Sequence, residues 1–256
     1  MAKWPISGGD GMSQDERRAY WESEHADHDY EGVFSISQDE GVIGPCVDAI
    51  TRRGCRRVIV AGCGSNVALQ QAIAERVPQV VSVTGVDFPR VVEVAARRTD
   101  DPRIGYVGAD IAVDGCGVSG DCVITINSVL SDLDEENRAL LRRFREALPE
   151  GGLLAGFFAT IFTPLELGYL QPDRRMLDQV NLEECRFAEE QQGITQIFYT
   201  PLRLRAVLRE AGFGLTRMEV VFFDSPELAD HARAYYRLGD DPDVMAWELF
   251  VEAVAQ

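Results

Sequence analysis

Export signals, membrane spans and paired cysteines are all missing from this chain of 256 residues. The first residues contain no apolar segment of the signal-peptide kind. The longest uncharged apolar run, residues 151–165, is too short to cross a bilayer and contains Pro164. Six cysteines are scattered without a C-x-x-C pair in a chain large enough to fold without disulfides. We therefore expect a cytoplasmic protein with reduced thiols.

Positive charge is also scarce. Lysine and arginine total 25 against 42 acidic residues, which gives a net charge of −17. Such a surface repels the phosphate backbone, so nucleic acid is not an expected partner. The only lysine is Lys3, and the resulting arginine bias is typical of a high-GC coding sequence. Apolar residues make up 46% of the chain and charged residues 26%, which is ordinary for a soluble protein with a full core.

The chain alternates short apolar runs with longer amphipathic stretches, the pattern of βαβ units. This alternation predicts an α/β fold whose sheet is doubly wound and mostly parallel. The expected strands are residues 58–61, 80–86, 103–107, 122–126, 152–159, 215–223 and 246–254, and the expected helices are residues 65–76, 89–98, 134–148, 201–211 and 226–238.

Two segments stand outside this alternation. Residues 1–55 are polar at first and then helical in pattern, so we expect an N-terminal helical cap before an α/β domain over residues 56–256. Residues 160–197 lose the alternation and are too long for an ordinary loop in a compact domain. We interpret this insertion as a lid over a ligand-binding site. The sequence leaves a monomer and a homodimer open.

A glycine turn follows the first expected strand directly and opens into a helix. In VIVAGCGSN, residues 58–66, Gly62 and Gly64 have no side chain to keep a ligand away from the backbone N–H groups. Asp87 ends the second strand, where a carboxylate can accept hydrogen bonds from a ribose diol. The alternative is that Asp87 caps the helix at Pro89.

Polar residues also end the third and fourth strands. Asp110 and Ile111 would place an acid and an apolar side chain where they suit an adenine amine and ring face. Asn127 ends the fourth strand. Because open α/β sheets bind ligands at the carboxyl ends of their strands, these residues are candidates for one site, although Asp110 and Asn127 are also common turn residues.

Over roughly residues 55–224 the chain resembles the class I S-adenosylmethionine-dependent methyltransferase superfamily. The resemblance rests on the order of the glycine turn, Asp87, the Asp110–Ile111 pair and the blocks at residues 121–152 and 199–214. The resemblance implies a Rossmann-like methyltransferase fold of seven strands, the last antiparallel, with S-adenosylmethionine as cofactor. We expect a small-molecule methyl acceptor in the specialised metabolism of a high-GC bacterium. The implied contacts are Gly62, Cys63 and Gly64 at the methionine portion, Asp87 at the ribose, Asp110 and Ile111 at the adenine, and Asn127 near the transferred carbon.

Two positions depart from the family pattern. Val60 stands where the family usually has an acidic residue, so one support for the cofactor's amino-acid end is missing. Asn66 replaces the third glycine, and asparagine is the non-glycine residue best suited to left-handed backbone angles.

Several further side chains are candidates for the site. His25 and His28 lie in a charged segment without a third ligand nearby, so we expect no metal and consider a base role instead. Tyr20, with Trp21 and Tyr30, either closes over the cofactor or packs the N-terminal helix onto the sheet. Tyr169 and Phe162 in the insertion either line the acceptor pocket, with Tyr169 in a catalytic role, or belong to a local core.

Three other functions compete with methyl transfer. An enzyme of the same fold can attack another sulfonium carbon, which would form a ring or move an aminocarboxypropyl group, and Val60 motivates that alternative. A dinucleotide-binding oxidoreductase needs Gly or Ala where this glycine turn has Val67. A non-catalytic protein with a relic cofactor site would bind the cofactor without turnover.

Overall fold

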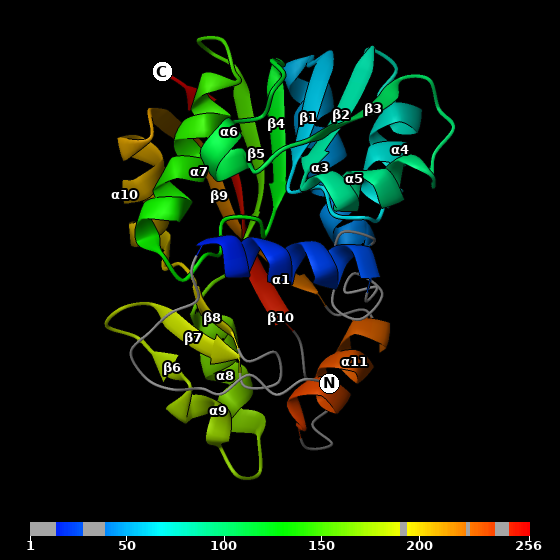
Figure 1. Ribbon diagram of the computed structural model, residues 1–256. Helices are drawn as coiled ribbons and strands as arrows, with labels where there is room; N and C mark the ends of the chain where they lie inside the picture. Colours follow the sequence, from blue (N-terminus) through cyan, green and yellow to red (C-terminus); the bar gives the residue numbers. More distant parts are fainter. Residues whose placement is uncertain (1–13, 28–38, 190–193, 224–225, 239–245) are drawn as a thin grey trace.

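The computed structural model describes residues 14–27, 39–189, 194–223, 226–238 and 246–256 (Figure 1). Its main feature is a seven-stranded sheet, which confirms the predicted α/β architecture. In spatial order the strands are β3 (Ile104–Gly108), β2 (Ser82–Asp87), β1 (Arg57–Ala61), β4 (Cys122–Ile126), β5 (Leu153–Phe158), β10 (Ala246–Ala255) and β9 (Phe213–Phe223).

The direction of the strands also agrees with the prediction. The first five strands of the chain pair in parallel, and β10 is antiparallel to both β5 and β9. All six residues of β5 are buried, as expected for a strand covered on both faces. Because the five parallel strands run the same way, their carboxyl ends meet at one edge of the sheet. We call this the carboxyl edge.

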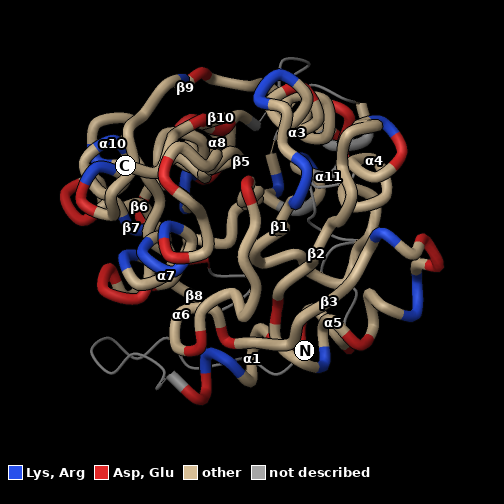
Figure 2. Tube along the Cα trace, turned by 90° about the horizontal axis from the view of Figure 1, so that it is seen from above, with Lys and Arg blue, Asp and Glu red and all other residues tan. Residues whose placement is uncertain are grey.

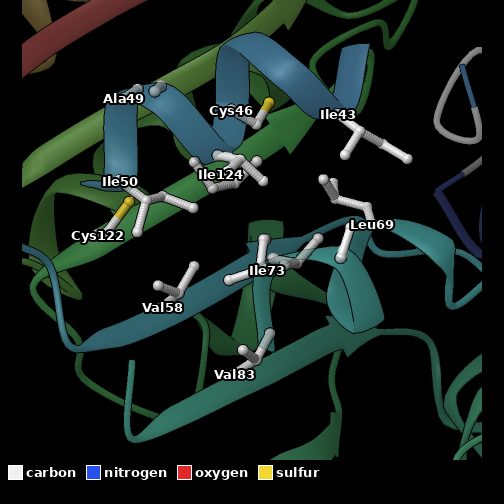
Figure 3. Close-up of a cluster of buried hydrophobic side chains, with 14 of the residues drawn as sticks. Ile43, Cys46, Ala49, Ile50, Val58, Leu69, Ile73, Val83, Cys122 and Ile124 are labelled. Atoms are coloured by element: carbon white, nitrogen blue, oxygen red, sulfur yellow. The ribbon is translucent and has the colours of Figure 1, made fainter. Parts of the chain in front are cut away.

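Helices cover both faces of the sheet. On one face, α3 (Glu40–Arg53) and α4 (Ala68–Arg76) pack against β1, β2 and β4 (Figure 3). On the other face lie α7 (Asp134–Glu146) and α10 (Pro201–Glu210). Thr200 caps α10, since its side chain accepts a hydrogen bond from the Arg203 backbone N–H. Two short connections complete the core unit, α5 (Pro89–Ala96) after β2 and α6 (Ile111–Asp114) after β3.

Charged residues lie mainly around the periphery, on helices and connections, as Figure 2 shows from above. Within the described ranges, no helix has the length and apolar character that crossing a bilayer requires. All six cysteines are buried, and none is joined to another in a disulfide.

Residues 160–197 contain more regular structure than the sequence predicts. They form α8 (Phe162–Leu170), α9 (Arg175–Asp178) and a small antiparallel sheet of β6 (Val180–Asn181), β7 (Arg186–Glu189) and β8 (Ile194–Ile197). Their apolar side chains pack with α11 (Pro226–Tyr236) in a separate core that includes Leu167, Phe187 and Ala232. Figure 1 shows this unit below the carboxyl edge.

The helix α1 (Gln14–Asp27) crosses the carboxyl edge (Figure 1). At one end Arg17 pairs with Asp132 and Glu136, which follow β4. At the other end Asp27 accepts two hydrogen bonds from Arg90 in α5, at 2.7 and 2.8 Å. The helix is therefore tied to segments that follow two different strands. The expected boundary between a cap over residues 1–55 and the α/β domain stays a prediction, and α3 packs into the main core.

Candidate cofactor and acceptor site

The glycine turn after β1 has the backbone shape that a ligand cradle needs. Gly62 and Gly64 have φ angles of 64° and 62°, in the left-handed region that favours glycine. The Gly62 and Cys63 N–H groups donate to the Val86 carbonyl oxygen at 2.9 and 3.2 Å. A Cβ atom on Gly62 would lie 2.3 Å from Cβ of Ser128. A side chain at position 62 is therefore excluded both by backbone strain and by space.

Asp87 is bound to this turn. Its Oδ2 atom accepts a hydrogen bond from the Gly64 N–H at 2.9 Å, and its Oδ1 atom accepts one from the Phe88 N–H at 2.7 Å. The side chain is 9% exposed. The alternative role as a helix cap is wrong, because Phe88 holds the N-cap position of α5 and Glu22 of α1, rather than Asp87, accepts the Arg90 N–H in the first turn of that helix at 3.0 Å. An ionised carboxylate can accept about four hydrogen bonds, so these two orient it for further contacts.

Asp110 and Ile111 follow β3 at the same edge and are buried. The Asp110 backbone N–H donates to Asp114, but its own carboxylate accepts no hydrogen bond from the residues that the structure describes. This carboxylate can therefore accept a hydrogen bond from a donor group of a ligand at this place. An adenine amine has that chemistry.

These residues fit S-adenosylmethionine. The turn at Gly62 and Gly64 lets a ligand approach the backbone, and the carboxylates of Asp87, the last residue of β2, and of Asp110, two residues after β3, lie at the same edge. Val60 is buried in the apolar core, so this position of β1 offers no acid to the cofactor. Asn66 does not adopt the expected left-handed angles; instead its Oδ1 atom accepts the Ala68 N–H at 2.8 Å and supports the start of α4.

Asn127 follows β4 and adopts the left-handed conformation, with a φ angle of 51°. Its backbone N–H donates to the Phe157 carbonyl oxygen at 3.0 Å. Its side-chain Nδ2 donates to Oε1 of Glu248 at 2.6 Å. The Oδ1 atom is buried, with no hydrogen-bond partner among the described residues. Asn127 therefore presents an unused acceptor beside a carboxylate from a distant part of the chain.

Glu248 is the residue of this region that the sequence analysis missed. It lies on β10, and its Oε2 atom is buried without a partner in the described part of the chain. Burial raises the pKa of Glu248 from 4.5 to about 7, although the hydrogen bond from Asn127 acts in the opposite direction. The available signal was a glutamate inside an apolar strand, AWELFVEAVA.

The candidates on α1 gather in one aromatic group. The Tyr20 and Trp21 rings meet edge to face with centroids 5.1 Å apart, and the Trp21 and His25 rings are 6.0 Å apart. His28 and Tyr30 lie outside the described residues. The placement of α1 along the carboxyl edge agrees with a covering role, and the roles of Tyr20 and His25 stay predictions.

The two candidates in the insertion, Phe162 and Tyr169, contact different residues. Phe162 stacks on Trp247 of β10, with centroids 6.2 Å apart. Tyr169 is 58% exposed, and the Arg174 guanidinium lies 5.9 Å from its ring centroid. This contact lies within the insertion and not at the glycine turn, so the catalytic role of Tyr169 also stays a prediction. Among the described side chains, no group of three or more His, Cys, Asp or Glu residues is arranged to hold a metal ion.

Known proteins resemble this chain in sequence and in fold. Residues 18–155 match the O-methyltransferase domain family. No curated protein matches the sequence. Among solved structures, the apo form of the S-adenosylmethionine-dependent methyltransferase SibL has a TM-score of 0.55 and 23% identity, over 88% of this chain and 57% of SibL.

Two ligand complexes share the fold at lower identity. Human N-acetylserotonin methyltransferase in complex with S-adenosylmethionine has a TM-score of 0.55 and 16% identity, over 95% of this chain and 56% of that one. The O-methyltransferase NcsB1 from neocarzinostatin biosynthesis, in complex with S-adenosylhomocysteine and 1,4-dihydroxy-2-naphthoic acid, has a TM-score of 0.52 and 18% identity, over 94% and 58% of the two chains. The present chain thus spans less than two thirds of each of these three proteins.

Proposed function

This chain belongs to the O-methyltransferase domain family of S-adenosylmethionine-dependent methyltransferases, and from that premise we propose that it methylates a hydroxyl group of a small molecule. The family match covers the glycine turn, Asp87, Asp110 and Asn127. One arrangement supports the activity most directly: Asp87 is hydrogen-bonded to the Gly64 N–H at 2.9 Å, so the ribose carboxylate and the glycine cradle form a single unit.

The acceptor is a small molecule in this proposal, and its use in bacterial specialised metabolism is part of the same proposal. The net charge of −17 disfavours nucleic acid as a substrate. NcsB1, which shares the fold, binds a dihydroxynaphthoic acid. Aromatic side chains of Phe162, Phe222 and Trp247 lie together where the insertion meets β10, and such a group suits a planar acceptor.

Most of the catalysis would come from positioning and from exclusion of water. S-adenosylmethionine supplies an electrophilic methyl group when it is bound. Asp87, Asp110 and the glycine turn would fix its nucleoside and methionine portions. The helix α1, tied down at Asp132 and at Arg90, would keep bulk water from the carboxyl edge. Asn127 would lie beside the reacting atoms.

The first experiment measures binding and turnover separately. We expect calorimetry to detect S-adenosylhomocysteine, and mass spectrometry to detect a methylated product when the protein is incubated with S-adenosylmethionine and 1,4-dihydroxy-2-naphthoic acid or simpler phenols. Binding without methylation of any of these acceptors would contradict the proposed hydroxyl acceptor.

The same incubation without an acceptor tests displacement at a non-methyl carbon. Val60 motivates this second candidate, because the buried apolar side chain leaves the cofactor's amine without the usual acid. Attack by that amine within the cofactor would release methylthioadenosine. Its enzyme-dependent formation would replace methyl transfer as the proposed reaction.

A further inference from the structure

Two buried oxygen atoms that have no partner among the described residues belong to side chains that are hydrogen-bonded to each other. They are Oδ1 of Asn127 and Oε2 of Glu248, and the bond between Nδ2 and Oε1 measures 2.6 Å. Buried polar groups in folded proteins nearly always have partners, and each exception calls for an explanation. A catalytic group that awaits its substrate is one such explanation.

The position of Glu248 in the sheet favours that explanation. Leu249 pairs with Phe158, the last residue of β5, so Glu248 lies level with the end of that strand. Asn127 directly follows β4, the neighbour of β5. Glu248 is therefore at the carboxyl edge, beside the strand end where the transferred carbon is expected.

Resting on the proposed function, we propose that Glu248 is the general base for the acceptor hydroxyl, with Asn127 as its positioning residue. Asn127 holds Oε1 and leaves Oε2 to face the acceptor. The acceptor O–H bond breaks and its proton goes to Oε2. The acceptor oxygen forms its bond to the methyl carbon as the bond from sulfur to that carbon breaks, and the electron pair of the broken bond stays on sulfur.

The charged groups named below, on the elements around β10, are engaged in hydrogen bonds or ion pairs of their own, so we do not assign the role of general base to them. On α8, Glu166 accepts a hydrogen bond from the Trp247 ring N–H at 2.6 Å. On β9, Arg217 pairs with Glu219 and with Glu252 of β10, and Arg52 of α3 also pairs with Glu252. The strand segments of β4 and β5 carry no charged residue.

The proton affinity of Glu248 suits the role. A general base is most effective when its pKa lies near the working pH, and burial raises the pKa of Glu248 to about 7. A carboxylate with an ordinary pKa would be too weak a base for an un-ionised phenol. The acceptor class that needs this base is a hydroxyl that keeps its proton at neutral pH.

The decisive experiment compares acceptors of different acidity in Glu248→Gln. Glutamine keeps the oxygen that accepts the Asn127 hydrogen bond but cannot take a proton. We expect kcat/KM for phenol and 1,4-dihydroxy-2-naphthoic acid to fall about 10²–10⁴-fold, the usual contribution of a general base. Methylation of 4-nitrophenol, which is ionised at mildly alkaline pH, should fall far less. The wild-type kcat/KM for phenol should rise as the pH increases through about 7, and this rise should be absent from the variant.

The matched control is Glu252→Gln, which removes another buried carboxylate from the same strand. Glu252 is paired with arginines and should show equal effects on all phenols. If Glu248→Gln methylates every phenol at wild-type rates, or loses all of them equally, the base assignment is wrong while the proposed function stands. If the wild type methylates no phenol, the hydroxyl acceptor fails and the base fails with it.

A second measurement needs no turnover. Infrared spectra of wild type minus Glu248→Gln, recorded across a pH series, should show one carboxylic acid that loses its proton near pH 7. S-adenosylhomocysteine should bind the variant with unchanged affinity, because Glu248 is assigned to the acceptor. A carboxyl group that titrates in the ordinary glutamate range would overturn the inference without touching the proposed function.

Discussion

The Gly64 backbone N–H donates to Oδ2 of Asp87 at 2.9 Å, so the glycine turn and the end of β2 form one hydrogen-bonded unit. The second oxygen of Asp87 is held by the Phe88 N–H. The carboxylate is thereby fixed before any ligand arrives. A preorganised acceptor of this kind loses little freedom on binding, which favours affinity.

Replacing Asp87 with alanine should weaken S-adenosylhomocysteine binding by about 1.5–3 kcal/mol, the range for hydrogen bonds that involve a charged group. Calorimetry measures this effect, and circular dichroism establishes that the variant is folded. Asp101→Ala is a suitable control, because Asp101 also accepts a backbone N–H but precedes β3 at the opposite edge. Wild-type affinity in a folded Asp87→Ala protein would remove Asp87 from the site.

Gly62→Ala should abolish or strongly weaken cofactor binding. The added Cβ atom would lie 2.3 Å from Cβ of Ser128, and the φ angle of 64° is unfavourable for alanine. Gly54→Ala separates these two effects, because Gly54 has a similar φ angle of 68° but no atom within 4 Å of an added Cβ. We expect Gly54→Ala to cost about 1–2 kcal/mol of stability and to bind normally. Equal affinities in the two variants would show that the turn only reverses the chain.

Glu248→Gln should stabilise the protein above neutral pH. The folded state raises the pKa of Glu248 from 4.5 to about 7. Between these values the folded protein holds the proton more tightly than the unfolded chain does, so wild-type stability falls as the pH rises. Above both values the cost is constant, at roughly 3–4 kcal/mol.

Urea denaturation at a series of pH values tests this expectation. The stability of Glu248→Gln relative to wild type should increase from about pH 4.5 to about pH 7 and then level off. Glu252→Gln, which loses contacts to two arginines, should show no such gain. A difference that does not change with pH would contradict the raised pKa.

Residues 160–197 should become more protected from hydrogen exchange when cofactor and acceptor are both present, together with α1, because lids close over bound ligands. Tyr169→Ala should impair turnover more than cofactor affinity if this insertion binds the acceptor. Protection that is already complete in the free protein and unchanged by ligands would identify the insertion as a fixed structural element, which its separate core would then explain.

The core sheet could be predicted from the sequence because its signals are local. The apolar runs before Gly62 and before Asp87 each form a mostly buried strand, and the observed ends lie within two residues of the predicted ones. The insertion could not be predicted, because its elements depend on distant partners. Leu167 and Phe187, for example, pack with Ala232 of α11.

The residues of the candidate site also differ in whether their placement depends on local signals or on distant partners. Gly62, Asp87 and Asp110 each lie at or within two residues of a strand end, so their placement needs only the parallel order of the sheet. Glu248 reaches Asn127 because β10 inserts between β5 and β9, a pairing between segments far apart in the chain. The sequence predicts a strand over residues 246–254 but does not single out Glu248, because its place at the carboxyl edge follows from the pairing of β10 with β5.

In the seven-stranded sheet β9 pairs only with β10, although β9 comes first in the chain. During synthesis β9 therefore leaves the ribosome before the strand that attaches it to the sheet. The five parallel strands and their helices are able to assemble while β9 still lacks its partner. The strand that carries Glu248 then joins the sheet last, so the nascent protein would complete the proposed cofactor site before the proposed acceptor base.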